Sequence, residues 1–473
     1  TIDSKTGKLG APKTLVSNLE APTSLTLDPK GEIYIADRGN SHQVKVFTSE
    51  GKPVKTFGKA GAPSAGIYDP DHMNNPKGLT VDSNGRLWVT EEDYQPKRVS
   101  IWNADGSLWK AFYGPQQYGG GGTLDPRDTS RFNYNGMEFN LDWKTRKSTL
   151  TRVYYRNDSD SFKIAAQDGH PDRLGSPPES AVYFNGHRYL TNSFSGSPTG
   201  GAASATIFLD RGDVVVPVAA AGRALDWSLL KEDAFKDRWP EGVDFKGERH
   251  RNGAIFFWSD LNGDGQVQPA EVRITAGTNG GVIVASDGSF LINNVTRGQE
   301  PGTALRFKPT SFTGQGAPVY AEEGELLGAS QNPFSTGGDQ VLMGSDGWAV
   351  LTNAPRPFPG DALGGAKDGV AMWSYPSLWP GLHASHEAPA PSFPGQLIGT
   401  TRLLGDFVTP RDSDAGPLFF INSNMGNMYV FTQDGLFVTQ LFHDVRQGSP
   451  WQMPLAQPGM LVNDLAIKDE NFF

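Results

Sequence analysis

The densest set of hard oxygen ligands in the chain lies in residues 260–271, which read DLNGDGQVQPAE. Side-chain oxygens fall at positions one, three, five and twelve, which are Asp260, Asn262, Asp264 and Glu271. Gln266 stands at position seven, where a calcium loop uses the backbone carbonyl. Ca²⁺ prefers six to eight hard oxygen ligands held in a flexible loop. The spacing therefore predicts a calcium site with these five residues as ligands.

Two further positions fit such a loop, and its flanks indicate what kind of loop it is. Gly265 supplies the turn at position six, and apolar Val267 follows at position eight. The segments on either side, AIFFWS at 254–259 and VRIT at 272–275, have strand composition. We therefore expect an EF-hand-type loop between two strands, with a structural role for Ca²⁺. The alternative is a polar surface turn.

Histidines could supply a second kind of chemistry. His72 lies in DPDHMNNP, and His383 and His386 lie in LHASHEAP. Imidazoles from separate loops can converge on a divalent metal that keeps an open position for water. These three residues are the candidates for a catalytic metal, a second divalent ion besides Ca²⁺. The alternative is that they are surface or packing histidines.

Seven glycines are each followed, six residues later, by a polar residue that closes an apolar stretch. Each segment reads as a tight turn, a short buried strand and a polar strand end. Such a unit cannot bury its own faces, so the copies must pack on one another. The seven pairs are Gly31 and Asp37, Gly85 and Glu91, Gly186 and Asn192, Gly253 and Ser259, Gly288 and Asn294, Gly347 and Asn353, and Gly416 and Asn422.

The first two copies are the clearest, and together they cover residues 18–115. Each has a proline, an Asp-x-x-Gly turn and a strand ending in an acidic residue, as in DPKGEIYIAD and DSNGRLWVTE. Four strands are visible in each copy, which is typical of a β-propeller blade. Both segments resemble NHL repeats, and the later copies carry only parts of that pattern.

The resemblance implies an all-β fold, a single β-propeller domain over residues 1–473. We expect seven blades, with six and eight as the alternatives. Loops and a short helix are expected on one face, in insertions at 116–175 and 219–250. The helix is predicted at 225–239, where LDWSLLKEDAFKDRW precedes a proline. Gly253 and Gly288 are close for a full blade, which leaves open that Gly253 is not a true repeat position.

The polar strand ends are the candidate ligand site. Equivalent positions of every blade lie on one face, and NHL-like propellers place ligands there. The alternative is that these residues cap strand ends and start turns. The candidate ligand-binding residues are Asp37, Glu91, Asn192, Asn294, Asn353 and Asn422.

Composition excludes several classes of function. The net charge is −10 with no evident basic face, so the chain is not expected to bind nucleic acid. The absence of cysteine excludes disulfides and thiol chemistry. No run approaches 18 apolar residues, so no membrane span is expected. The chain begins at Thr1, which favours a processed N-terminus, and its last residues read as another strand that could continue past residue 473.

Two functions follow, and the sequence leaves open whether the protein is an enzyme. The first is a secreted or periplasmic, calcium-stabilised NHL-like propeller that binds a small molecule, glycan or protein on its polar face. The alternative is a metal-dependent lyase or hydrolase that acts on a carbohydrate or lactone at the channel mouth. The first rests on the calcium loop and strand ends, and the second on the histidines and long insertions.

Overall fold

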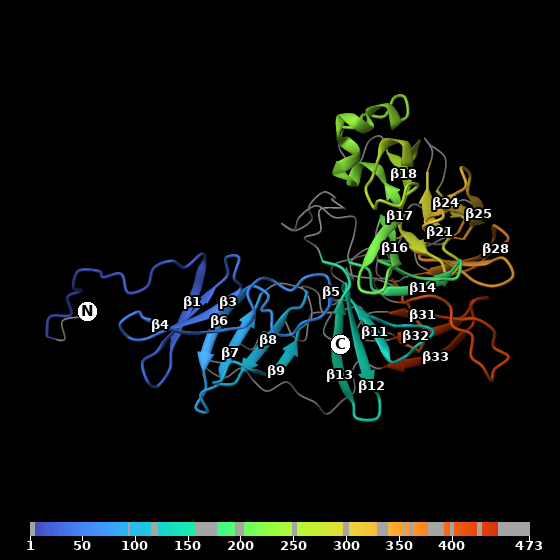
Figure 1. Cartoon of the computed structure of the whole chain (residues 1–473). Coiled ribbons are helices and arrows are strands. Elements are labelled where there is room, and N and C mark those ends of the chain that lie inside the picture. The colour runs from blue at the N-terminus through green and yellow to red at the C-terminus, as the bar shows by residue number, and fades with distance from the viewer. Residues whose placement is uncertain are drawn as a thin grey trace. The chain divides into compact units, whose positions relative to one another are not determined.

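The computed structural model describes most of the chain, and Figure 1 traces its elements in order. By contact, the chain divides into unit 1, residues 1–117 and 150–156, and unit 2, residues 118–149 and 157–473. Each unit is described by itself below. The described residues are 5–92, 95–114, 122–156, 177–193, 203–247, 253–296, 302–328, 339–353, 355–358, 363–376, 392–397, 402–422 and 428–442.

Unit 1 holds two four-stranded antiparallel sheets, each with its strands in sequence order. The side chains of Val44, Val46, Met73, Val89 and Trp102 form part of their shared apolar core. The first sheet is β1 (Pro22–Leu27), β2 (Ile33–Asp37), β3 (Gln43–Phe47) and β4 (Pro53–Phe57). The second is β6 (Pro76–Val81), β7 (Leu87–Glu91), β8 (Arg98–Trp102) and β9 (Leu108–Tyr113). Between them, β5 (Gly66–Ile67) pairs with the end of β13 (Lys147–Val153).

Unit 2 repeats this meander and extends it. It opens with β10 (Thr123–Leu124), β11 (Arg131–Tyr134) and β12 (Met137–Asp142). A six-stranded sheet follows: β14 (Ser180–Phe184), β15 (His187–Thr191), β16 (Ser204–Asp210), β17 (Val215–Arg223), β18 (Ala254–Ser259) and β19 (Val272–Ala276).

Three more four-stranded sheets complete the described part of unit 2. The first is β20 (Val282–Val284), β21 (Phe290–Val295), β22 (Thr303–Phe307) and β25 (Glu325–Gly328), with the hairpin β23 (Pro309–Phe312) and β24 (Pro318–Tyr320) before β25. The second is β26 (Val341–Met343), β27 (Trp348–Leu351), β28 (Leu363–Lys367) and β29 (Val370–Tyr375). The third is β30 (Arg402–Leu403), β31 (Leu418–Asn422), β32 (Met428–Thr432) and β33 (Phe437–Phe442).

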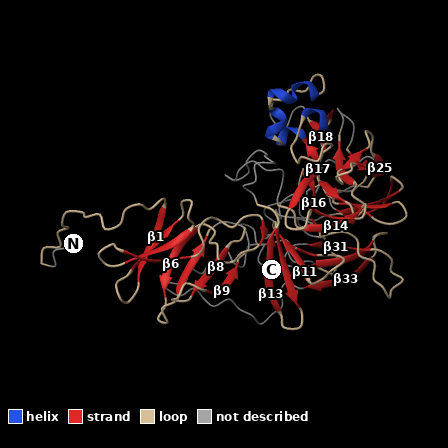
Figure 2. Ribbon diagram, viewed as in Figure 1, coloured by secondary structure: helices blue, strands red, loops and turns tan. Residues whose placement is uncertain are grey.

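The prediction of an all-β fold built from propeller-type sheets is confirmed. Figure 2 shows strands throughout, with helix confined to one region. Among the described residues, that helix consists of short 3₁₀ segments only. No helix in the described ranges is long and apolar enough to cross a membrane. The number of blades stays a prediction.

Six of the seven predicted glycine turns join the first and second strands of a sheet. All six glycines have positive φ, from 71° at Gly416 to 82° at Gly31. Glycine adopts this region without steric cost, which is why the turns are visible in the sequence. The six are Gly31, Gly85, Gly186, Gly288, Gly347 and Gly416.

The turn predicted at Gly253 was wrong, and another turn of the same kind was missed. Gly253 precedes β18, the fifth strand of the six-stranded sheet, and not the second strand of a new one. The missing turn is at Asn135 and Gly136, whose φ values are 51° and 82°, between β11 and β12. Gly136 is followed six residues later by Asp142, so the same sequence signal was present there.

The described parts of the two predicted insertions contain strands. Residues 123–153 form β10 to β13, so much of 116–175 is sheet. Residues 219–223 belong to β17, so the second insertion begins after Arg223. The single helix predicted at 225–239 is instead three short 3₁₀ helices, Ala224–Asp226, Ser228–Lys231 and Asp233–Arg238. Extended backbone at Trp227 and Glu232 separates them, so the apolar side chains reach the core without a continuous helix.

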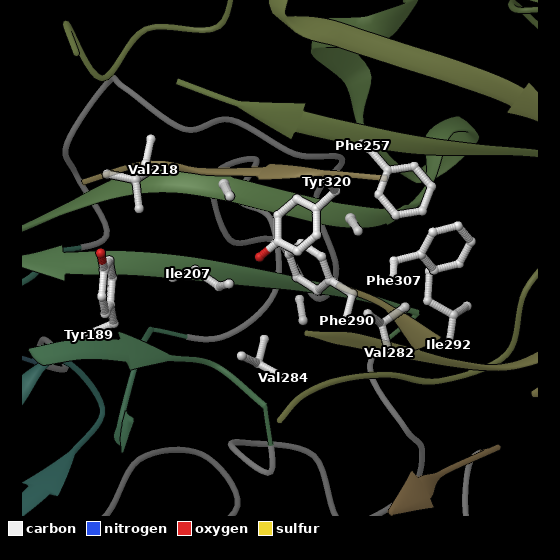
Figure 3. Close-up of a cluster of buried hydrophobic side chains, with 14 of the residues drawn as sticks. Tyr189, Ile207, Val218, Phe257, Val282, Val284, Phe290, Ile292, Phe307 and Tyr320 are labelled. Atoms are coloured by element: carbon white, nitrogen blue, oxygen red, sulfur yellow. The ribbon is translucent and has the colours of Figure 1, made fainter. Parts of the chain in front are cut away.

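An aromatic cluster holds the six-stranded sheet against the next one (Figure 3). The rings of Phe257 and Phe307 lie 4.6 Å apart, as do those of Phe290 and Tyr320. The Tyr320 hydroxyl donates to the Gly288 carbonyl at 2.8 Å, so its polar end is satisfied within the core. This packing fixes the sheet that carries residues 260–271.

Glu179 is a buried carboxyl that has no basic partner among the residues that the structure describes. It precedes β14, is 3 % exposed, and accepts a hydrogen bond from the Asn135 backbone N–H at 2.9 Å. Burial is the main influence on its pKa, which rises to about 7, although the N–H groups of Asn135 and Gly122 act in the opposite direction. The folded protein therefore retains this proton at pH values where the unfolded chain loses it.

We expect Glu179→Gln to remove a pH dependence of stability. A raised carboxyl pKa contributes stability below the unfolded pKa, and that contribution is lost as pH rises through about 7. The loss is on the order of 3 kcal/mol for a shift of this size. Thermal unfolding midpoints at pH 5 and pH 8 measure it. The difference should shrink in Glu179→Gln but persist in the control Glu241→Gln, which alters an exposed carboxyl. Equal pH dependence in all three proteins would contradict the assignment.

Candidate functional site

The predicted calcium loop connects β18 and β19, as the strand-like flanks indicated. These strands pair antiparallel, with Trp258 opposite Val272. The loop starts at Asp260, whose backbone N–H donates to the Val218 carbonyl at 2.9 Å. It ends in a one-turn 3₁₀ helix, Pro269–Glu271. Both ends of the loop are thus anchored on the sheet.

Asp260 organises the first half of the loop. Its side chain is buried, and its two carboxylate oxygens accept from the N–H groups of Gly263 at 2.8 Å and Gly265 at 3.1 Å. Both glycines have positive φ, 81° and 70°. The chain can therefore fold around the carboxylate without the strain that a side chain would add.

Glu271 closes the loop from the other end. One carboxylate oxygen accepts from the N–H groups of Leu261 at 2.8 Å and Asn262 at 3.4 Å. The other accepts from the Trp258 indole at 3.2 Å and the Gln268 N–H at 3.3 Å. Positions one and twelve of the motif are therefore brought onto the same short loop, as the spacing predicted.

Asp264 lies on the exposed side of the loop. One of its oxygens accepts from the Gln266 N–H at 2.8 Å. The other accepts from the side-chain amides of Asn262 at 2.9 Å and Gln268 at 2.8 Å. The pKa of Asp264 is lowered, chiefly by the Gln266 N–H, so this group stays ionised.

The loop concentrates negative charge without a basic counterpart. Among the described residues, no salt bridge involves Asp260, Asp264 or Glu271. The pKa of Asp260 is raised by burial first and then by the nearby charges of Glu271 and Asp264, while its bonds to Gly263 and Gly265 lower it. An all-oxygen donor set of this kind suits a hard cation.

Carboxylates alone do not complete a metal site here. In the described ranges, no three His, Asp or Glu side chains are grouped to hold a metal ion by themselves. A cation in the loop would also need the Asn262 amide oxygen and the Gln266 carbonyl. It would compete with the N–H groups that the carboxylates now bind.

Of the three predicted catalytic histidines, only His72 lies in the part of the chain that the structure describes. His72 Nδ1 lies 2.9 Å from the Gly61 carbonyl oxygen, and its Nε2 lies 3.9 Å from an Asp69 carboxylate oxygen. His383 and His386 lie outside the described residues. The second metal therefore stays a prediction.

The strand-end residue Asp37 is buried inside unit 1. Its oxygens accept from the N–H groups of Glu20 at 3.1 Å and Ala21 at 2.7 Å, and from Lys45 Nζ at 2.6 Å. Burial alone would raise its pKa, but Lys45 and the backbone donors outweigh burial and lower it. Asp37 thus fastens the chain that leads into β1.

Glu91 is fastened in the same way. Its carboxylate accepts from Arg98 Nε at 2.8 Å, the Ser100 hydroxyl at 2.5 Å and the Asn74 N–H at 2.7 Å. Burial raises its pKa although Arg98 opposes the shift. Arg98 also donates to the Tyr68 hydroxyl at 2.5 Å and to two backbone carbonyls, so its charge is well compensated.

The four predicted strand-end asparagines of unit 2 are also engaged within the protein. Three of them use the side-chain oxygen as an acceptor. Asn192 accepts from the Thr206 N–H at 2.8 Å, Asn353 from Asn293 Nδ2 at 2.8 Å, and Asn422 from the Arg402 N–H at 2.9 Å. Asn294 has a φ of 50°, and its Nδ2 lies 3.5 Å from an Asp339 oxygen. These contacts support the capping alternative, and ligand binding by the six residues stays a prediction.

The structure adds residues that the sequence patterns missed. Asn293 donates to the Gln340 carbonyl at 3.0 Å. The Gln340 side chain in turn accepts from the Leu403 N–H at 2.9 Å and donates to the Leu403 carbonyl at 3.3 Å. We call Asn293, Gln340, Asn353, Arg402 and Asn422 the strand-end cluster, because they join the ends of three successive sheets.

A positional signal for Arg402 was present in the repeats. The first strand of a sheet begins opposite the polar strand end, as with Pro22 and Asp37 or Pro76 and Glu91. Arg402 lies opposite Asn422 in the same way. Aligning the last repeat on these prolines would have placed a charged residue where the first two repeats have proline.

Comparison with known proteins supports one repeat directly. The family model for the NHL repeat matches residues 19–47, which span β1 to β3. The chain therefore contains an NHL repeat, as the resemblance indicated. The second sheet of unit 1 has the same strand order and register start, which agrees with a second copy. No curated protein matches the sequence.

Several solved structures show a distant likeness. One, from a nidogen/laminin complex, is 15% identical, with 42% of this chain and 63% of that chain covered and a TM-score of 0.19. The match thus spans less than two thirds of that chain. A protein from Lactobacillus plantarum is 11% identical, with coverages of 78% and 88% and a TM-score of 0.24. A putative oxidoreductase (glucose dehydrogenase) from Thermus thermophilus is 15% identical, with coverages of 74% and 97% and a TM-score of 0.18.

We expect Glu91→Ala to destabilise unit 1 strongly. The substitution leaves the buried Arg98 guanidinium without its carboxylate, and breaking a buried pair in this way costs about 3–5 kcal/mol. Urea unfolding followed by tryptophan fluorescence measures the loss. Glu92→Ala is the matched control, because the neighbouring Glu92 is exposed and pairs with Arg38 on the surface. The double variant Glu91→Leu with Arg98→Met should recover part of the loss. A loss below about 1 kcal/mol in Glu91→Ala would contradict the role assigned to the pair.

Proposed function

We propose that this NHL-repeat protein is a calcium-stabilised propeller that works outside the cytosol and binds a ligand on its polar strand-end face. The calcium part rests on one observation: three carboxylates lie in the short loop 260–271, Asp260 is influenced by the charges of the other two, and none of the three has a salt bridge to a described residue. The ligand would be a small molecule, a glycan or a protein segment.

A bound Ca²⁺ would act on the stability of the β18–β19 hairpin. It would offset the mutual repulsion of Asp260, Asp264 and Glu271 and the burial of Asp260. A ligand that binds only the folded state stabilises that state in proportion to RT ln(1 + [L]/Kd). The role is structural, since the loop joins two paired strands and not two mobile helices.

A secreted or periplasmic location follows from the same proposal. Extracellular calcium modules bind with Kd values of about 10⁻⁴–10⁻³ M, which calcium outside the cytosol can fill. The exposed position of Asp264 and the few charged ligands fit such a weak site.

The strand-end cluster supports the ligand-binding part. Polar residues from three sheets meet there, and amide groups of this kind fix the orientation of ligands in many sites. The lyase or hydrolase alternative would need a histidine-bound metal. In the described residues, His72 already contacts a carbonyl, and no observation there favours that chemistry.

We expect Ca²⁺ to raise the thermal unfolding midpoint, and Asp264→Asn to weaken the effect at least tenfold in Ca²⁺ concentration. Asparagine can keep the turn but loses one ligand charge, and ligand charge tunes calcium affinity. Midpoints are measured against CaCl₂ after treatment with a chelator, with MgCl₂ in parallel. Asp105→Asn is the matched control, because Asp105 is an exposed aspartate that accepts from the N–H two residues on, as Asp264 does. The calcium proposal is wrong if wild type shows no saturable response, or if both variants respond alike.

The calcium response should also weaken as the solution becomes more acidic. The raised pKa of Asp260 means that a proton competes with the cation at a higher pH than for an ordinary aspartate. Without Ca²⁺, the stability that this group contributes is present below its unfolded pKa and lost as pH rises through its folded pKa. Calorimetric titration at pH 5 and pH 7.5 should show weaker binding and greater proton release at pH 5. Identical affinity and no proton release at both pH values would contradict the role of Asp260.

A further inference from the structure

Arg402 occupies a special position in the strand-end cluster. It is the first residue of β30 and lies opposite Asn422, whose side-chain oxygen accepts from its backbone N–H at 2.9 Å. The next residue, Leu403, is held on both backbone groups by the Gln340 side chain. Two side chains therefore fix the backbone at Arg402 and Leu403 by hydrogen bonds. One is at the end of β31 and the other lies just before β26.

The guanidinium itself is buried but has no partner among the described residues. Arg402 is 9 % exposed, and no hydrogen bond joins its guanidinium to a described residue, although its backbone N–H donates to Asn422. A small part of the residue remains exposed to solvent. Five N–H donors in a planar fork are thus available at this point.

Two other arginines with largely buried side chains are used differently. Arg98 donates to a carboxylate, a hydroxyl and two carbonyls. Arg188 contacts the carboxylates of Asp125, Glu138 and Asp210 at 2.6–3.0 Å. Neighbouring acids compensate both of these guanidinium groups, whereas no described acid pairs with Arg402.

The buried surroundings of Arg402 disfavour the charged form of its guanidinium. Burial lowers its pKa to about 10, and no carboxylate of the described residues offsets this shift. An arginine at that value is still charged at neutral pH. A buried charge without a partner costs folding stability, and an incoming anion would remove that cost.

We propose that Arg402 is the anion-recognition residue of the strand-end cluster and binds the oxyanionic group, carboxylate or phosphate, of an acidic ligand. The planar fork of arginine matches both groups in a bidentate manner. Asn422, which contacts the Arg402 backbone, and Gln340, which contacts Leu403, would orient the rest of the ligand. This inference rests on the proposed function, because it names the ligand class of that same face.

Simple anions test the inference directly. Thermal midpoints are measured with sodium acetate and with inorganic phosphate, against sodium chloride at the same ionic strength. We expect a saturable upward shift in wild type, in the millimolar range, for at least one of the two anions, and its loss in Arg402→Gln. Arg211→Gln, which alters an exposed arginine, should respond as wild type does. The comparison of acetate with phosphate shows which oxyanion the site prefers. No shift in wild type, or an equal shift in Arg402→Gln, overturns the inference.

The stability of the anion-free protein gives a second readout. Arg402→Met should unfold at the same temperature as wild type or about 2 °C higher, since it removes an unpaired buried charge. A structural arginine would behave in the opposite way, and a clear fall of the midpoint in Arg402→Met overturns the inference.

A glycan array with acidic and neutral glycans separates this inference from the proposed function. Binding of acidic glycans by wild type but not by Arg402→Gln supports both. Equal binding of neutral glycans by both proteins overturns the anionic specificity and leaves ligand binding at the face intact. If wild type binds neither glycans nor simple anions, the anionic inference and glycan binding by this face both fail, while the calcium titration tests the metal loop independently.

Discussion

The sheets of this protein depend on polar side chains that satisfy buried backbone N–H groups at strand ends. Asp37 and Glu91 each close a second strand and accept from the chain that leads into the first strand of the same sheet. Asn422 does the same for Arg402. A buried N–H without an acceptor costs about 1–3 kcal/mol, so these oxygens fix where each sheet begins. They explain why the pattern of glycine, apolar strand and polar end recurs.

The same constraint changes how the polar strand-end face is understood. Residues that looked available for a ligand are occupied in holding the sheets together. The buried charged groups differ in whether an opposite charge lies beside them. Asp37 has Lys45 and Glu91 has Arg98, whereas Asp260 and Arg402 are buried without an opposite charge among the described residues. These uncompensated charges of opposite sign are the basis of the two proposals, a cation at the loop and an anion at the strand ends.

Turns that depend on local backbone preferences were predictable from the sequence. Predictions failed where contacts with the rest of the fold determine the local structure. The positive φ of Gly31 depends on the turn alone, so spacing revealed it. Gly253 was assigned to a turn because the strand after it has the right composition, yet that strand extends an existing sheet. Gly136 was passed over inside an apparent insertion. The segment 225–239 has helical composition, but its aromatic anchors draw it into separate 3₁₀ turns against the core.

The sequence by itself determined the strand-and-turn repeat, the all-β class and the order of oxygen ligands in residues 260–271. These depend on backbone preferences and on spacing within a few residues. Only the tertiary structure decided that Asp37 and Glu91 are buried caps, that Gln340 holds Leu403, and that no acid among the described residues pairs with Arg402. The solvation of a charge and the partners of a buried polar group are set by residues far away in the chain, and spacing within one segment carries no information about them.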